Sequence, residues 1–170
     1  QEFRVSIEAA EKLSQSGNLV CFGVKPTHPH TAYGYISVGD SFGEGFEVSR
    51  FIEKPGQEKA KDLLSSGAHF WNSGIYCFKG GTLLEELSRY SPEILATAKE
   101  ALADAVVTGD VLMLSEEAYA KCKSISIDTA VIEKTLRAVM VPLDAKWRDL
   151  GNWPEFFSDL NLDSKGNTVE

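Results

Sequence analysis

Apolar residues change their spacing several times along the chain, and these changes predict helices that alternate with strands. A helical spacing over residues 1–16 predicts an amphipathic helix, with Gly17 placed to end it. The apolar positions of this helix are Phe3, Ile7, Ala10 and Leu13. The continuous apolar run at residues 19–24 is typical of a strand that is buried on both faces.

Alternating polarity in the next part of the chain predicts a hairpin. Residues 35–38 and 46–53 alternate in polarity on either side of a turn expected at residues 39–45. Residues 57–66 then predict a helix, and residues 72–78 predict the next strand.

Three helices are expected between residues 82 and 120, and they look like packing elements. Thr82 fits a capping box, Ser91 precedes a proline at the first helical position, and Asp110 is placed to open the third helix. These helices carry none of the candidate site residues, so an additional role in joining identical chains into a homo-oligomer is left open.

The remaining pattern completes an α/β fold. A short helix is expected to end near Thr135, residues 138–142 predict a strand, and Asn152 is placed to cap a last helix. We therefore predict a mostly parallel sheet with an antiparallel hairpin and flanking helices. One domain is expected over residues 1–161, followed by a polar linker over residues 162–170.

Composition narrows the kinds of partner. The 170 residues include 17 basic and 25 acidic side chains, for a formal charge of -8, so we expect no binding to nucleic acid or to anionic membranes. An anionic substrate would need a local basic spot. The three cysteines show no CxxC pairing, and the chain has neither a signal peptide nor a long apolar run, which favours a cytoplasmic protein with reduced thiols.

The candidate chemistry begins with a carboxylate and an ammonium group at the end of the predicted hairpin. Glu53 and Lys54 are adjacent and precede Pro55, which turns the chain away, so the pair could hold a sugar hydroxyl and a phosphate. A solvated pair before a proline is the alternative. Gly34 has no Cβ and lets a ligand approach the backbone, although it could equally be a turn residue.

Three further side chains could contribute polar atoms. Asn72 offers an amide donor and acceptor to neighbouring hydroxyls, or it satisfies turn backbone. Asp149 could hold Mg²⁺, which keeps several waters and shares phosphate oxygens, or it is a turn residue before a glycine. Asp128 has the same two interpretations, with helix capping as the alternative. The histidines His28, His30 and His69 lack metal-ligand spacing and are expected to be loop residues.

Seven ordered segments resemble mannose-1-phosphate guanylyltransferases. They are residues 23–27, 33–36, 51–55, 71–75, 126–130, 133–135 and 147–151. The nearest form is similar to the bacterial enzymes in which a mannose-6-phosphate isomerase domain often follows. The family's glycine-rich signature, which holds the nucleotide phosphates, has no counterpart in these residues. The resemblance therefore implies the C-terminal, sugar-phosphate-binding half of a Rossmann-like nucleotidyltransferase domain, without its guanine-binding half.

The resemblance also implies roles for individual residues. Gly34 would contact mannose through its backbone, Glu53 and Asn72 would bind sugar hydroxyls, and Asp128 would be a helper near the site. Lys54 would neutralise the sugar's phosphate.

Asp149 would bind Mg²⁺, the one cofactor expected. The implied reaction is attack by mannose-1-phosphate on the α-phosphorus of GTP, which yields GDP-mannose and pyrophosphate. Another sugar-1-phosphate nucleotidyltransferase, and a catalytically silent sugar-phosphate-binding or assembly module, remain alternatives. The isolated chain is expected to be inactive.

Overall fold

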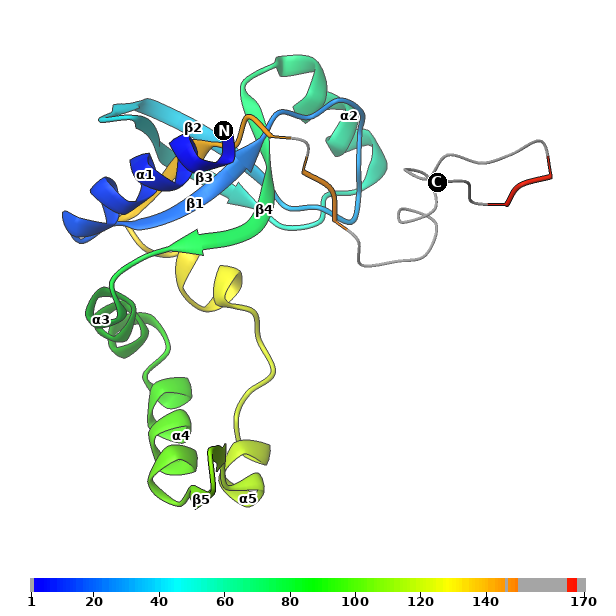
Figure 1. Cartoon of the computed structure of the whole chain (residues 1–170). Coiled ribbons are helices and arrows are strands. Elements are labelled where there is room, and N and C mark those ends of the chain that lie inside the picture. The colour runs from blue at the N-terminus through cyan, green and yellow to red at the C-terminus, as the bar shows by residue number, and fades with distance from the viewer. Residues whose placement is uncertain (1, 146, 150–164, 168–170) are drawn as a thin grey trace.

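The protein is built on one mixed sheet that closes on itself. The computed structural model describes residues 2–145, 147–149 and 165–167 (Figure 1). The closed sheet has the strand order β1 (Leu19–Val24), β4 (His69–Cys77), β2 (Tyr35–Phe42), β3 (Gly45–Ile52) and β7 (Ala138–Pro142), with β7 pairing back onto β1. Every strand thus has a partner on both sides, and the ring has no open edge.

The prediction of a mostly parallel sheet is wrong for the described residues. Only β1 and β7 pair in parallel, whereas the other four pairings are antiparallel. The helix α2 (Gln57–Ser66) does connect two strands that run in the same direction, β3 and β4, as a strand–helix–strand pattern predicts. However, β2 lies between β3 and β4 and runs in the opposite direction, so it pairs with both of them in antiparallel fashion.

The predicted helix at the start of the chain is confirmed as α1 (Glu2–Gln15), but it presents a different face to the sheet. Its buried residues are Ser6, Ala9, Ala10, Leu13 and Ser14. Phe3 and Ile7 are 45% and 41% exposed, so the apolar face predicted from them is only half correct. Small side chains let the helix lie close to the strands, and Ser6 Oγ donates a 2.9 Å hydrogen bond to the carbonyl of Pro142.

The strand β1 confirms the prediction of burial on both faces. Val20 and Phe22 pack toward α1, whereas Cys21 packs inside the closed sheet with Ile36 and Met140. Burial raises the pKa of the Cys21 thiol to about 12, so this cysteine is an inert core residue. All three cysteines carry free thiols.

The hairpin is confirmed with a tighter turn than predicted. Strand β2 ends at Phe42 and strand β3 begins at Gly45, which leaves a two-residue turn in which Gly43 has a φ of +58°. Residues 39–42, which are predicted to be part of the turn, instead continue strand β2. The predicted helix α2 and strand β7 are confirmed as well, and Gly67, with a φ of +68°, follows the end of α2. Strand β4 begins at His69, three residues earlier than predicted.

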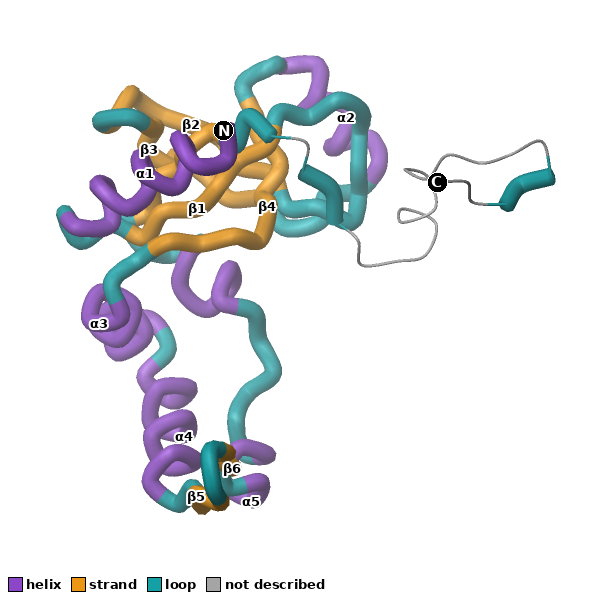
Figure 2. The backbone as a smooth tube through the Cα atoms, in the orientation of Figure 1, coloured by secondary structure: helices purple, strands orange, loops and turns teal. Residues whose placement is uncertain are grey.

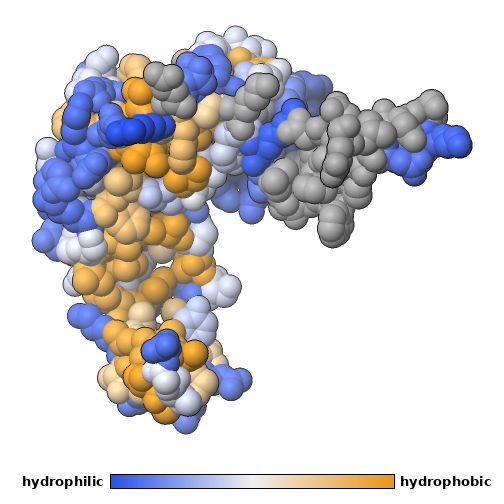
Figure 3. Space-filling model, in the orientation of Figure 1, coloured by the Kyte–Doolittle hydropathy of each residue, from blue (hydrophilic) through white to orange (hydrophobic). Residues whose placement is uncertain are grey.

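Beyond β4, the chain forms an arm that projects from the sheet (Figure 1). The arm contains α3 (Gly80–Tyr90), α4 (Pro92–Ala103), the two-stranded sheet of β5 (Val106–Thr108) and β6 (Val111–Met113), and α5 (Glu116–Ala120), as Figure 2 shows. Apolar side chains gather along this arm (Figure 3). A short π-type helical turn, η1 (Asp128–Ile132), then returns the chain to β7.

Two of the predicted helix starts in the arm are wrong. Thr82 lies inside α3 and is buried, because α3 begins two residues earlier. Asp110 lies in the turn between β5 and β6, and α5 is instead capped by Ser115, whose side chain accepts from the amide of Ala118. The residues Val106, Val107, Val111 and Leu112 are β-branched or apolar in short runs, which favours strands over a helix.

None of the helices in the described ranges is long and apolar enough to cross a membrane. The predicted helix capped by Asn152, the boundary at residue 161 and most of the predicted linker over residues 162–170 lie outside the described residues.

Candidate functional site

Strand register brings three of the predicted site residues to one place. Tyr35 at the start of β2 pairs with Ile52 at the end of β3 and with Trp71 in β4. The residues next to these three along the chain are Gly34, Glu53 and Asn72. The backbone amide of Asn72 donates a 2.8 Å hydrogen bond to the carbonyl of Gly34. Segments that are far apart in sequence therefore meet at this end of the sheet.

Gly34 lies directly against the side chain of Glu53. A Cβ built on Gly34 would be 2.9 Å from Glu53 Oε2, 3.2 Å from Phe51 and 3.4 Å from the Cβ of Asn72. A glycine is therefore required for the present position of the Glu53 carboxylate, and the backbone φ of Gly34 is not in the left-handed region. The observation favours a close-approach role for Gly34 over the turn alternative.

Lys54 is held beside Glu53 by an unusual backbone conformation. Its φ is +40°, which is the only positive φ of a non-glycine residue among those described. Its ammonium group lies 3.4 Å from Glu53 Oε1, with 64% of the lysine side chain and 35% of the glutamate side chain exposed. Left-handed backbone is costly for a residue with a Cβ and is concentrated at functional sites. The pair is thus fixed in place yet open to solvent.

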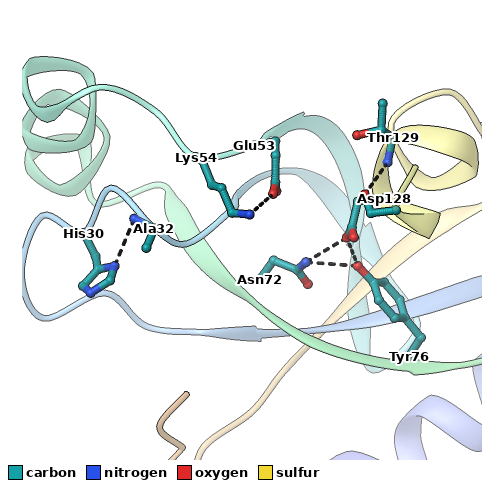
Figure 4. Close-up of polar contacts among 9 residues, drawn as sticks. His30, Ala32, Glu53, Lys54, Asn72, Tyr76, Asp128 and Thr129 are labelled. Carbon is teal, nitrogen blue, oxygen red and sulfur yellow. Dashed lines mark hydrogen bonds and ion pairs between the residues drawn. The ribbon is translucent and has the colours of Figure 1, made fainter. Parts of the chain in front are cut away.

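Asn72, Tyr76 and Asp128 form a closed ring of hydrogen bonds (Figure 4). The Asn72 amide nitrogen donates 3.0 Å bonds to Asp128 Oδ1 and to the Tyr76 hydroxyl, and that hydroxyl donates to Asp128 Oδ1. Burial, together with the bond to Asp128, raises the pKa of Tyr76, so its proton stays on the hydroxyl. The Asn72 carbonyl accepts from the amide of Gly74 at 3.2 Å.

This ring adds a structural role to the expected role of Asn72. The Tyr76 hydroxyl oxygen and Asp128 Oδ1 are bonded to each other and lie on the same side of the amide nitrogen, so one amide hydrogen shared between them serves both contacts and the other points away from them. Asp128 begins η1, and its second carboxylate oxygen makes no hydrogen bond with any described residue. The residue that precedes η1 is Ile127, so Asp128 does not cap this helix, and the nearby Ser126 Oγ accepts from the amide of Thr129 at 3.4 Å. Among the described residues, Asp128 thus keeps one carboxylate oxygen without a hydrogen bond at the site.

Tyr76 is the one member of this group that the sequence interpretation missed. It lies four residues after Asn72 in the same strand, a spacing at which regular alternation predicts both side chains on one face of the sheet. That spacing is the signal that could have found it. The two side chains do meet, although the strand between them is irregular and Gly74 has a φ of +72°. An Asp128 partner 52 residues away could not be read from spacing.

Asp149 lies on the segment that follows β7. It is exposed, and two residues before it Trp147 packs edge-on against Tyr33, with ring centroids 5.5 Å apart. Tyr33 adjoins Gly34, so the Asp149 segment passes close to the site. The described residues contain no group of three or more histidine, cysteine or carboxylate side chains arranged to hold a metal. A single exposed carboxylate fits Mg²⁺ only where phosphate oxygens and waters supply the other ligands.

The histidines lie beside the site rather than in a metal centre. His28 and His30, as predicted, are in the loop between β1 and β2, where they pack on Trp71 and Tyr33. His69 was also expected in a loop, but it is the first residue of β4 and bonds Ser66 at 2.7 Å. The aromatic side chains and Arg148 line a pocket of about 440 Å³ on the face of the sheet that Trp71 occupies.

Comparisons with known proteins agree on one family. The family model described as nucleotidyl transferase matches residues 1–165. The mannose-1-phosphate guanylyltransferase of Escherichia coli (strain K12) is 39% identical over 170 residues, which is 97% of this chain and 36% of that protein. The xanthan biosynthesis protein XanB of Xanthomonas campestris pv. campestris (strain B100) is 41% identical, over 97% of this chain and 35% of that protein. The chain thus spans about a third of the length of these relatives.

Two solved structures have the same fold. One, titled as mannose-6-phosphate isomerase from Helicobacter pylori, aligns with a TM-score of 0.82 and 35% identity over 88% of this chain and 59% of its own. The other, titled as mannose-1-phosphate geranyltransferase from Thermus thermophilus, aligns with a TM-score of 0.77 and 32% identity over 89% of this chain and 43% of its own. The chain belongs to the nucleotidyl transferase family.

Proposed function

We propose that this chain provides the sugar-phosphate-binding part of a mannose-1-phosphate guanylyltransferase, which forms GDP-mannose and pyrophosphate from mannose-1-phosphate and GTP. The relatives that carry this name are 37–39% identical to the chain where they align. The proposal includes GTP as the nucleotide, Mg²⁺ as the cofactor and the cytoplasm as the location. It includes no nucleic acid or membrane partner.

One observation supports a sugar-phosphate ligand above others. Hydrogen-bond acceptors and the Lys54 ammonium group meet at the site. Glu53 and the free oxygen of Asp128 can each accept from a hydroxyl, and Lys54 can bind a phosphate as a point charge. A polyol donates hydroxyl protons, and its phosphate carries negative charge, so a sugar phosphate complements this set. In a chain with a net charge of -8, Lys54 supplies the local basic spot that an anionic substrate needs.

The proposed reaction places most of the chemistry on the two reactants. A phosphate oxygen of mannose-1-phosphate attacks the α-phosphorus of GTP, and pyrophosphate leaves, so no covalent enzyme intermediate is needed. Glu53, Asp128 and the Gly34 backbone would orient the sugar, and Lys54 would neutralise its phosphate, since positioning and charge neutralisation dominate phosphoryl transfer. Asp149 would hold Mg²⁺, which neutralises phosphate charge when it is bound.

The test is pyrophosphate release by the full gene product, with mannose-1-phosphate, GTP and Mg²⁺. We expect release with GTP to exceed release with UTP, dTTP, ATP or CTP, and release with mannose-1-phosphate to exceed that with glucose-1-phosphate. Preference for another pair would support the alternative of a different sugar-1-phosphate nucleotidyltransferase. Sugar-phosphate binding without release from any pair would support the silent binding module.

The similarity to the Helicobacter pylori structure calls for one additional assay. Because that protein is named as a mannose-6-phosphate isomerase, the same preparation is tested for interconversion of mannose-6-phosphate and fructose-6-phosphate. We expect no isomerisation that depends on Lys54. If Lys54→Ala abolishes isomerisation and leaves pyrophosphate release intact, the proposed function is wrong for this site.

A further inference from the structure

We propose that Tyr76 is a positioning residue of the sugar site, which fixes the Asp128 carboxylate so that its second oxygen accepts a hydroxyl of the substrate sugar. The inference rests on the proposed function, because it assigns a role within the same site. Tyr76 would not touch the sugar. It would act through Asp128, whose orientation it shares with Asn72.

The hydrogen-bond ring has only one consistent arrangement of donors. A carboxylate only accepts, so Asp128 Oδ1 must face the Asn72 amide nitrogen and the Tyr76 hydroxyl hydrogen. The Tyr76 oxygen shares with Asp128 Oδ1 the one Asn72 amide hydrogen that faces them, because the two oxygens lie on the same side of the amide nitrogen. Each of the three side chains therefore constrains the other two, and removal of the tyrosine hydroxyl leaves Asp128 with a single bond to hold its rotamer.

The hydrogen-bond ring of Asn72, Tyr76 and Asp128 is only part-buried, so it can fix the Asp128 carboxylate and still leave it accessible. Tyr76 and its bonds are part-buried, and the tyrosine ring packs against the core residues Cys21, Ile36 and Met140 inside the closed sheet. Bonds to a charged acceptor in a partly desolvated position are stronger than those in water. The tyrosine is thus anchored in the core at one end and bonded to the carboxylate at the other.

The hydrogen-bond ring lies across the site from the Glu53–Lys54 pair. Glu53 and Lys54 lie across from Asn72 and Asp128, with their polar ends directed toward the same space (Figure 4). The Cβ of Asn72 and the carboxylate of Glu53 both lie against Gly34. Two carboxylates, Glu53 and Asp128, can then accept from different hydroxyls of one sugar. A change in the rotamer of Asp128 would move one of these two acceptors away from the sugar.

The experiment measures steady-state kinetics of the full gene product and its variants Tyr76→Phe, Asp128→Asn and the double variant. Tyr76→Phe is expected to lower kcat/KM for mannose-1-phosphate about tenfold through KM, with the KM for GTP unchanged within about twofold. In the Asp128→Asn background the same change should have almost no further effect, because residues that act as one unit are not additive. Tyr119→Phe, on the exposed face of α5, is the matched control.

Thermal unfolding of each variant accompanies the kinetics. A structural role alone would lower the Tm and change both KM values together. An unchanged KM for mannose-1-phosphate in Tyr76→Phe, or an equal effect of that change with and without Asp128, would overturn the inference while the proposed function stands. Absence of both turnover and mannose-1-phosphate binding by the wild-type protein would overturn both, since no sugar site would remain for Tyr76 to order.

Discussion

At the scale of single residues, the site depends on two backbone positions that no side-chain chemistry would reveal. Gly34 leaves no room for a Cβ beside Glu53, and Lys54 has a φ of +40°. Together these two backbone positions determine where the Glu53 carboxylate and the Lys54 ammonium group lie. The two positions differ in energetic terms, because Gly34 is unstrained and Lys54 is strained, so substitutions at them separate binding from stability.

Lys54 should oppose stability while it supports binding. Replacing it with glycine removes the left-handed strain, so we expect the free energy of unfolding to rise by about 1 kcal/mol, as measured by urea titration. Lys54→Ala keeps a Cβ and should not gain this stability. Both variants should lose affinity for mannose-1-phosphate, by about tenfold or more, because both lose the charge-assisted contact with its phosphate. Equal stability of the two variants would mean that Lys54 is not strained.

Gly34→Ala should weaken sugar-phosphate binding with little effect on stability. The new methyl group would displace the end of the flexible Glu53 side chain, which costs little in folding but moves an acceptor of the site. We expect affinity for mannose-1-phosphate to fall about tenfold in isothermal titration calorimetry. Gly39→Ala is the matched control, since a Cβ there would meet its nearest atom at an ordinary 3.6 Å. A similar loss in both variants would argue against the Gly34 contact.

At the scale of elements, a buried polar cluster joins the arm to the sheet. Glu86 in α3 is only 2% exposed and accepts a 2.5 Å hydrogen bond from Thr135, in the segment between η1 and β7. Arg137 lies 3.6 Å from the other Glu86 oxygen. In the same region, the hydroxyl of Ser91 between α3 and α4 donates to the carbonyl of Ala130 in η1. Through η1, these contacts hold the segment that carries Asp128.

Thr135→Val should destabilise the protein by about 1–3 kcal/mol, because it keeps the shape of the side chain but leaves a buried carboxylate with one fewer donor. Chemical denaturation monitored by circular dichroism measures the change. Thr97→Val in α4 serves as the control, since its hydroxyl donates to a carbonyl within its own exposed helix face. A loss at Thr135 no larger than that at Thr97 would exclude a structural role for the bond to Glu86.

Local patterns predicted most elements of this fold but not their pairing. The helix at residues 57–66 and the strands at 19–24 and 138–142 follow from periodicity and end signals that lie within each segment. The arm hairpin β5–β6 was mistaken for a helix because its strands are too short to show alternation. The antiparallel order depends on β2 inserting between β3 and β4, which is a tertiary choice that no local pattern encodes.

The candidate site was predictable to the extent that its residues stand at strand ends. Gly34, Glu53 and Asn72 adjoin the ends or first residues of predicted strands, and the register brings them together. The donor arrangement around Asp128 was not predictable, because it requires a partner from η1 and a tyrosine that looks like a core residue in the sequence. The metal role of Asp149 remains a proposal.

At the scale of the whole molecule, the buried thiol of Cys21 and the part-buried hydroxyl of Tyr76 make the free energy of unfolding depend on pH in the alkaline range. Burial raises the pKa of the Cys21 thiol to about 12, and burial with the bond to Asp128 raises the pKa of the Tyr76 hydroxyl. In the unfolded chain both groups return to their ordinary pKa values of about 8.5 and about 10. Above those values the unfolded state releases protons that the folded state retains, so stability must fall as pH rises.

The free energy of unfolding should therefore decline above about pH 9, by up to about 1.4 kcal/mol per pH unit for each group once pH exceeds its unfolded pKa. Below that pH both groups are protonated in both states and contribute no slope. Urea titrations at a series of pH values measure the decline, and Tyr76→Phe combined with Cys21→Ala should flatten it. The control pair Tyr119→Phe and Cys122→Ala removes the same chemical groups from α5 and from the segment after it, and so measures the effect of losing a phenol and a thiol elsewhere in the chain. A slope unchanged by the buried pair would show that neither group retains its proton in the folded protein.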